Sequence, residues 1–380
     1  MSDPVTTPRG TPRFLKLLFS LAVALFVWIV LVEGVLRFVP VEGFTKDDLD
    51  PPMLTDESKL RNRPHPYLAY SLTPGYRSFK KARSQASHNS LGFRGPETTW
   101  WKPEGVYRIA CLGGSSTYGH TPSSDATTWP ARLEHHLEEA YPDRRIEVVN
   151  AGTSGYSTFE SIANLAFRVV EFQPDLVIVY HSINDMRCLL YPDPRPDNTH
   201  WRAVWSRTRE SPIERWLAHS MTYLIARKHL TDYLERSREL GGVVIVDYEE
   251  KVDKYARSLE GVDFSVFERN LRTLAAIARG HGAEILFSTQ GFERRDIGGP
   301  SRKAQVEAMG RMKEILKRFG RREGVAVVEG GLALEIEAAK QRNATGEQRI
   351  FSHEVHLFDE GTDLLARTLA EEIRKRGWLD

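Results

Sequence analysis

Short apolar runs alternate with longer stretches of helical periodicity from residue 108 onward. The runs predict strands at 108–112, 146–149, 176–180, 284–288 and 325–328. The stretches between them carry apolar residues at helical spacing and predict helices at 129–140, 158–171, 265–281 and 303–319. Because strands that are separated by helices pair in parallel and are covered on both faces, this alternation predicts an α/β domain with a parallel sheet.

The amino-terminal region holds the longest apolar run. Residues 17–36 contain one polar side chain, Ser20, and one charge, Glu33. Between Lys16 and Arg37 the run has about the 20 residues that a helix needs to cross the hydrocarbon core of a bilayer. No small-residue cleavage pattern follows it, so we expect an uncleaved transmembrane helix rather than a signal peptide.

The charges on the two sides of this helix differ. The helix is preceded by Arg9, Arg13 and Lys16, and it is followed, with fewer basic residues nearby, by Asp47, Asp48 and Asp50. Basic residues favour the cytoplasmic side of a membrane. We therefore expect a single-pass protein with its amino terminus in the cytoplasm and its α/β domain on the outer side.

The chain divides into three predicted regions. Residues 1–40 form the cytoplasmic tail and membrane anchor, 41–100 an extended juxtamembrane segment rich in Pro and Gly, and 101–380 the α/β domain. A helical insertion at about 186–263 interrupts the alternation. Its tryptophans are Trp201, Trp205 and Trp216. Three interpretations stay open for the insertion: a lid over a site, a surface that rests on the membrane, or an extra helix pair packed on the core.

Composition excludes several classes of protein. The chain has 380 residues, of which 41% are hydrophobic and 27% charged, and this composition is typical of a folded chain with a large core. The formal net charge of +1 gives no general attraction to nucleic acid, and we expect no nucleic-acid partner. Cys111 and Cys188 are too few for a disulfide framework and do not have the spacing of a zinc site.

Four polar clusters follow strands or lie near the carboxyl terminus. The first is "CLGGSSTYGH" (111–120), in which two glycines allow a sharp turn and place Ser115 or Ser116 at the carboxyl end of a strand, where ligands bind in open α/β sheets. The others are "NAGTSGYS" (150–157), "HSINDMR" (181–187) and "FSHEVHLFDEG" (351–361). Together they offer a hydroxyl nucleophile, a histidine base and donors for an oxyanion.

These clusters resemble the sequence blocks of the SGNH (GDSL-type) hydrolases, in particular membrane-anchored bacterial members. "GGSST" is similar to the block that carries the nucleophile and selects Ser115, and "NAGTSG" to the block whose glycine, here Gly155, supplies an oxyanion donor. "SIND" is similar to the block with the second donor, Asn184, and "HEVHL" to the block with the base, His356. The resemblance covers roughly residues 85 to 380.

Three positions depart from the family pattern. Gly114 stands where the first block usually has Asp, and Ser182 where the third usually has Gly, but neither position supplies a reacting atom. His353 stands where the family has the Asp that orients the base, and loss of that carboxylate costs rate. Either the chain works as a Ser-His dyad or another group orients His356. Glu354, Asp359, a carboxylate from elsewhere in the fold and a backbone carbonyl all stay open.

The resemblance implies a three-layer α/β/α flavodoxin-like domain and a serine esterase that acts on acyl esters. Outside the membrane, a short acyl ester on a surface polysaccharide is the expected substrate, with lipid esters second. Two alternatives stay open: an O-acyltransferase on the same scaffold, and a non-catalytic binding or assembly protein on a degenerate one. The implied chemistry needs no metal or organic cofactor. "HEVH" lacks the zinc-protease spacing, and the glycines match neither a P-loop nor a dinucleotide motif.

Overall fold

The structure is a computed structural model that describes residues 13–38, 61–63, 65, 67–68, 70–78, 84–191, 194–198, 212–217, 219–223, 225–226, 259–293 and 299–380. Contacts divide the chain into two compact units. One consists of Met1–Lys59 with Arg207–Gly242, and the other of Leu60–Ser206 with Val243–Asp380. The first unit contains the apolar helix and the second contains the sheet.

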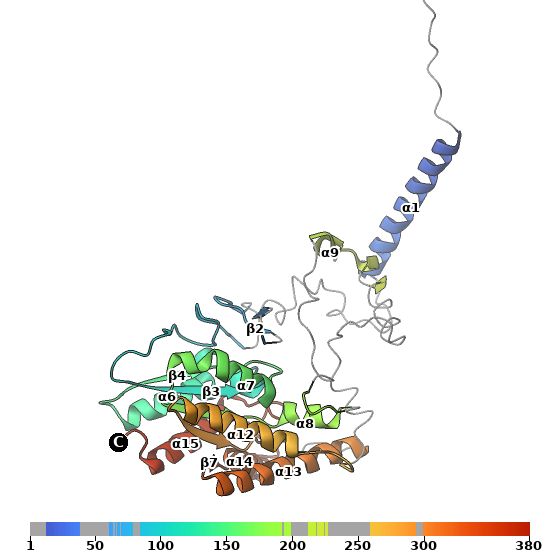
Figure 1. Ribbon diagram of the computed structural model, residues 1–380. Coiled ribbons are helices and arrows are strands. Elements are labelled where there is room, and N and C mark those ends of the chain that lie inside the picture. The colour runs from blue at the N-terminus through green and yellow to red at the C-terminus, as the bar shows by residue number, and fades with distance from the viewer. Residues whose placement is uncertain are drawn as a thin grey trace, which may run out of the picture. The chain divides into compact units, whose positions relative to one another are not determined.

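The second unit is built on a five-stranded parallel sheet with the strand order β4-β3-β5-β6-β7. Figure 1 shows helices on both sides of its strands. Its strands are β3 (Val106–Gly113), β4 (Arg145–Asn150), β5 (Leu176–Tyr180), β6 (Glu284–Ser288) and β7 (Ala326–Val328). All four pairings are parallel, so each connection crosses a face of the sheet. The predicted strands and their parallel pairing are confirmed, as is the flavodoxin-like order, which reverses direction beside β3.

Helices cover both faces of this sheet, which gives the three predicted layers. One face carries α7 (Thr158–Phe167), α8 (Ile183–Leu190), α12 (Ser265–Gly280) and α13 (Gly299–Glu323). The other carries α6 (Trp129–Ala140), α14 (Gly330–Thr345) and α15 (Asp359–Arg376). The predicted helix at 158–171 ends at Phe167 and continues as the 3-10 turn Val169–Phe172.

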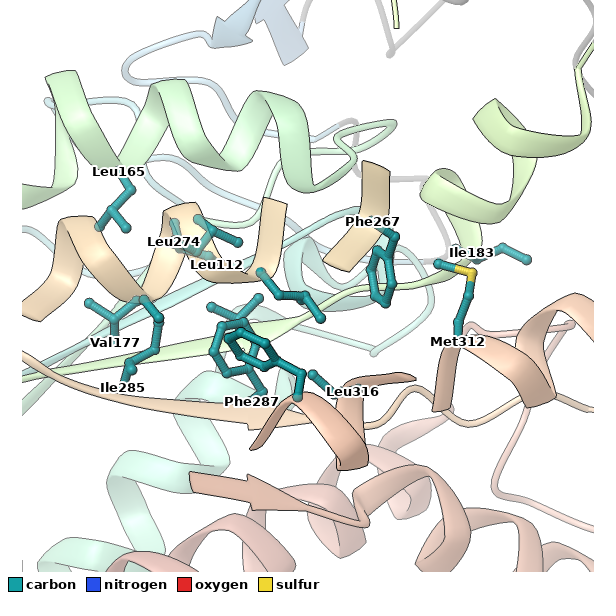
Figure 2. Close-up of a cluster of buried hydrophobic side chains, with 14 of the residues drawn as sticks. Leu112, Leu165, Val177, Ile183, Phe267, Leu274, Ile285, Phe287, Met312 and Leu316 are labelled. Atoms are coloured by element: carbon teal, nitrogen blue, oxygen red, sulfur yellow. The ribbon is translucent and has the colours of Figure 1, made fainter. Parts of the chain in front are cut away.

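The core follows from the alternation of side chains along the strands. Figure 2 shows Leu112, Val177 and Phe287 packed with side chains from the helices of the first face. Those partners are Leu165, Ile183, Phe267, Leu274, Met312 and Leu316. Neighbouring strand residues such as Cys111 and Ile178 belong to the cluster on the opposite face. Two buried faces explain why these strands read as continuous apolar runs.

The segment before the sheet is part of the second unit. It contains the short antiparallel pair β1 (Asn62–Arg63) and β2 (Ser71–Leu72). Further along, Arg94 pairs with Asn150 of β4, and its buried guanidinium donates to Asp125 Oδ1 over 2.8 Å. Part of the segment predicted to be juxtamembrane therefore contributes contacts beside the carboxyl ends of the strands. The boundaries at 40 and 100 stay predictions.

The first unit contains α1 (Arg13–Phe38) and the short helix α9 (Pro212–Leu217). Among the described residues, Phe14–Phe38 is the one helix whose length and mean hydropathy, 2.7, suit a membrane span, and its apolar window is unburied. Length and composition also fit a signal sequence. Most of the predicted insertion, with Trp201 and Trp205, lies outside the described residues.

Candidate active site

Ser115 lies where β3 ends and a helical turn begins. Gly113 is the last residue of β3, Gly114 caps the turn, and α5 (Ser115–Tyr118) follows. The Ser115 amide is in the first turn, where helical N–H groups have no partner within the helix. The fold therefore presents both the hydroxyl and the amide of Ser115 at the carboxyl edge of the sheet.

His356 reaches Ser115 from a loop at the other end of the chain. His356 Nε2 and Ser115 Oγ are 2.8 Å apart, a hydrogen bond across 241 positions. The loop is a narrow hairpin, closed by the bridge between Phe351 and Leu357 and by the Ser352 amide, which donates to His356 O over 2.9 Å. Its backbone geometry holds the imidazole in place.

Ser116 and Gln290 tie this loop to the neighbouring elements. The Ser116 hydroxyl donates to Val355 O over 2.9 Å, so it serves as an internal contact. Gln290 Nε2 donates to Ser116 Oγ over 3.3 Å, and Gln290 Oε1 accepts from the Ile183 amide over 2.7 Å. The buried Gln290 side chain thus joins α5 to the start of α8, and Ser116 joins α5 to the histidine loop. Sequence analysis missed Gln290, because a glutamine after β6 matches no catalytic pattern.

Gly155 lies in the turn after β4 with φ of +81°, which favours glycine. A Cβ at this position would stand 2.4 Å from the hydroxyl oxygen of Tyr70. That hydroxyl donates to Ser154 O, and the Tyr156 hydroxyl donates to Tyr70 O. The segment that precedes the sheet therefore fixes the turn that carries Gly155.

Asn184 lies in the first turn of α8, close to this glycine. Asn184 Nδ2 donates to Tyr156 O over 2.8 Å, which orients the amide. A Cβ at Gly114 would lie 2.7 Å from Asn184 Nδ2, so the space of a side chain at 114 is filled by Asn184. Ser182 has φ of 177°, an extended backbone that any residue adopts. The departures from the family pattern at Gly114 and Ser182 are therefore accommodated by this backbone.

The described residues do not supply a carboxylate that orients His356. Glu354 is engaged by Arg302 and lies 3.5 Å from Arg187, and Asp359 accepts from the Ser123 amide and hydroxyl over 2.8 and 2.6 Å. Neither of these two nearby acids contacts His356. In the part of the chain that the structure describes, no carboxylate is hydrogen-bonded to that imidazole. The exposed His353 ring stacks near it, with 6.3 Å between centroids.

Electrostatics keep His356 neutral. Burial, followed by the electrostatic interactions with His353 and Arg187, lowers the pKa of His356 to about 4. An imidazole with so low a pKa is unprotonated at neutral pH and is able to accept a proton. In the described part of the chain, no neighbouring carboxylate stabilises the imidazolium that then forms, whereas an aspartate beside the histidine would do so.

A second histidine, His120, lies against the first. The two rings are 5.6 Å apart between centroids. His120 Nδ1 is 3.2 Å from Arg61 Nη1, and His120 Nε2 is 2.6 Å from Ser154 Oγ. Because a guanidinium only donates, Nδ1 accepts and Nε2 donates to the serine. Burial keeps the pKa of His120 well below its usual value. His120 ends the quoted "GGSSTYGH" stretch, but no spacing rule singles it out.

The fold and this arrangement define the class of the protein. A hydroxyl hydrogen-bonded to a neutral imidazole, with amide donors on the adjacent loops, lies at the carboxyl ends of strands in a doubly wound sheet. A model of the GDSL-like lipase/acylhydrolase family matches residues 111–364, about two thirds of the chain, and the protein belongs to this family. It is accordingly an ester hydrolase by class.

Solved structures with a similar fold include three esterases or lipolytic proteins. A two-domain esterase (CEX) active on acetylated mannans is 14% identical with a TM-score of 0.41. That comparison covers 71% of this chain and 49%, about half, of the esterase. A variant of Axe2, an acetyl xylan esterase from Geobacillus stearothermophilus, is 18% identical with a TM-score of 0.43, with coverage of 70% and 94%.

The third is a putative lipolytic protein of the G-D-S-L family from Desulfitobacterium hafniense. It is 12% identical with a TM-score of 0.40, and the comparison covers 70% of this chain and 98% of that one. A search of curated proteins found no match.

Proposed function

We propose that the protein is a membrane-anchored serine esterase that removes an acyl group from an ester on the outer side of the membrane. The observation that carries the proposal is the 2.8 Å hydrogen bond between Ser115 Oγ and His356 Nε2. A hydroxyl is a weak nucleophile until a base within hydrogen-bond reach takes its proton. The low pKa of His356 leaves its imidazole free to do this at neutral pH.

Acylation uses the four residues of the site. Ser115 Oγ bonds to the ester carbonyl carbon while its proton moves to His356 Nε2, and the carbonyl π electrons move to the oxygen. The amides of Ser115 and Gly155 and the Asn184 side chain donate to that oxyanion. When the intermediate collapses, the bond to the alcohol oxygen breaks, and His356 returns the proton to the leaving alcohol.

Deacylation repeats these steps with a second nucleophile. Water attacks the acyl-Ser115 ester, His356 takes one of its protons, and collapse releases the carboxylic acid and restores the serine. A sugar hydroxyl in place of water would make the protein an O-acyltransferase. Addition of glycan acceptors during turnover separates the two reactions, because a transferase passes the acyl group to the added hydroxyl.

The proposed substrate is a short acyl ester on an envelope polysaccharide, with lipid esters second. Its support is location: α1 suits a membrane span, and the charge bias around it favours an outward-facing domain. An enzyme held in that position meets envelope glycans and lipids. Trp216, one of the aromatic side chains of the predicted insertion, belongs to the first unit.

Turnover of p-nitrophenyl esters of increasing chain length by the full-length protein in detergent tests this proposal. We expect acetate to be cleaved fastest, and Ser115→Ala and His356→Ala each to lower kcat by about 10³-fold or more. Faster cleavage of long chains would favour a lipid substrate. Unchanged turnover in Ser115→Ala would exclude the proposed nucleophile.

A further inference from the structure

Glu33, the one acidic residue in the apolar run of α1, binds a segment from the predicted insertion. Its carboxylate accepts from Met221 N over 2.8 Å, Ser220 Oγ over 2.9 Å and Thr222 N over 3.0 Å. Helix α1 and this segment both belong to the first compact unit. A carboxylate near hydrocarbon is costly unless it is paired, and these donors pair it.

Arg37, one turn further along α1, strengthens the same contact. Arg37 Nη2 donates to Glu33 Oε1 over 3.1 Å and to His219 O over 3.1 Å. Glu33 therefore accepts from backbone amides of residues 219–222, and Arg37 donates to a backbone carbonyl of the same segment. We call the set of Glu33, Arg37 and residues 219–222 the α1 clamp.

The clamp caps a helical turn. The Tyr223 amide donates to Ser220 Oγ over 3.2 Å, as expected of a capping serine. Met221 N and Thr222 N are amides of the first turn, which a helix cannot satisfy by itself. Glu33 supplies the acceptors that these amides need.

The clamp also fixes α9, which ends two residues before it. The Ser220 amide donates to Leu217 O over 2.9 Å, which joins α9 directly to the clamped turn. Ile213 and Trp216 are 69% and 75% exposed, and their separation of three residues places them on one face of the helix. An apolar face that contains a tryptophan is therefore held beside the last turns of α1.

We propose that α9 is a membrane-interface helix whose Ile213 and Trp216 enter the lipid, positioned there by the α1 clamp. The occupant of this face is the bilayer, because the apolar window of α1 is itself unburied and its apolar run reaches Val32, directly before Glu33. Tryptophan is enriched at this depth in membranes. The inference rests on the proposed membrane span of α1.

The chain is suited to a direct measurement, since its two cysteines, Cys111 and Cys188, are both buried. Trp216→Cys in the full-length protein is labelled with an environment-sensitive fluorophore and reconstituted in phosphatidylcholine/phosphatidylglycerol vesicles. A helix that lies about 5–10 Å below the headgroup boundary brings the label within reach of spin-labelled acyl chains. Lys340→Cys, an exposed position on α14, is the matched control. Extraction at alkaline pH reports separately whether α1 is inserted.

We expect acyl-chain quenchers to remove most of the emission at position 216 and none at position 340. Adding Glu33→Leu, which makes α1 more apolar, should abolish quenching at 216 while α1 resists extraction. Inserted protein without quenching at 216 would overturn the interface helix, and quenching that survives Glu33→Leu would overturn the clamp. Extraction of α1 would overturn this inference together with the proposed anchor, and turnover of esters would be unaffected by that outcome.

Discussion

Ser115 and His356 form a hydrogen-bonded pair without a third member among the described residues. The imidazole starts neutral because burial, assisted by His353 and Arg187, lowers its pKa to about 4. The same environment disfavours the imidazolium that forms when the Ser115 proton is transferred. The proposed mechanism therefore has a base that is available but weak, chiefly because it is buried.

This pKa sets the pH dependence of turnover. Protonation removes the base, so activity falls as the pH falls through the pKa of His356. With a pKa of about 4, kcat/KM should stay level from neutral pH to about pH 5 and decline near pH 4. Measurement of kcat/KM for p-nitrophenyl acetate across this range is the test. A decline centred near the ordinary histidine pKa would contradict a buried imidazole that has no carboxylate partner among the described residues.

Replacing His353 by aspartate should restore a compensating charge. His353→Asp places a carboxylate where the family has its orienting acid. We expect kcat to rise about tenfold or more and the acid limb of the pH profile to move upward, because the imidazolium is then stabilised. His353→Asn is the uncharged control. A variant with unchanged kcat and pH profile would show that position 353 does not act on His356.

The segment ahead of the sheet supports one half of the proposed oxyanion site. The Tyr70 hydroxyl holds Ser154 O, and the two tyrosine rings of Tyr70 and Tyr156 pack with 5.5 Å between centroids. This contact fixes the peptide that precedes Gly155. Loss of the Tyr70 contact should therefore displace the Gly155 amide from the oxyanion without unfolding the domain.

Tyr70→Phe removes the hydroxyl and keeps the ring. Loss of one hydrogen bond of about 1 kcal/mol predicts a drop in kcat of about five- to tenfold, with KM little changed, since the oxyanion forms only in the transition state. Tyr67→Phe, at an exposed tyrosine, is the matched control. A change in KM alone would indicate that Tyr70 acts on substrate binding.

The core packed against β3 contributes to the stability of the domain. Leu112 is fully buried between β3 and the helices of the first face (Figure 2). Leu112→Ala should lower the free energy of unfolding by about 2–5 kcal/mol, because it removes buried area and leaves a cavity. Urea unfolding measures the loss, with the exposed Leu332→Ala as control. A cost below 1 kcal/mol would mean that this core repacks freely.

Much of the fold could be predicted from the sequence, and the physical reason is burial. Strands covered on both faces read as short apolar runs, so β5 and β6 begin and end where the pattern predicts. Helix α14 was not predicted from the sequence, because it begins with Gly330 and Gly331 and two adjacent glycines are typical of a loop. A Cβ at Gly331 would stand 2.6 Å from the backbone of Gln290, so close packing requires this glycine.

The site was predictable only where a motif marks it. Ser115 and His356 stand in recognisable blocks and meet in the structure. Tyr70, His120 and Gln290 act through contacts between segments that are remote in sequence, and such contacts leave no spacing pattern. The engagement of Glu354 by Arg302 is likewise a tertiary contact, which is why sequence left the orienting group open.

The activation of Ser115 is the central claim, and covalent labelling tests it most directly. The full-length protein in detergent is treated with a fluorophosphonate, and the modified residue is identified by peptide mass mapping. The account predicts one adduct, on Ser115, that is lost in Ser115→Ala and retained in Ser116→Ala. Folded protein that forms no adduct, or forms it on another residue, would contradict the account.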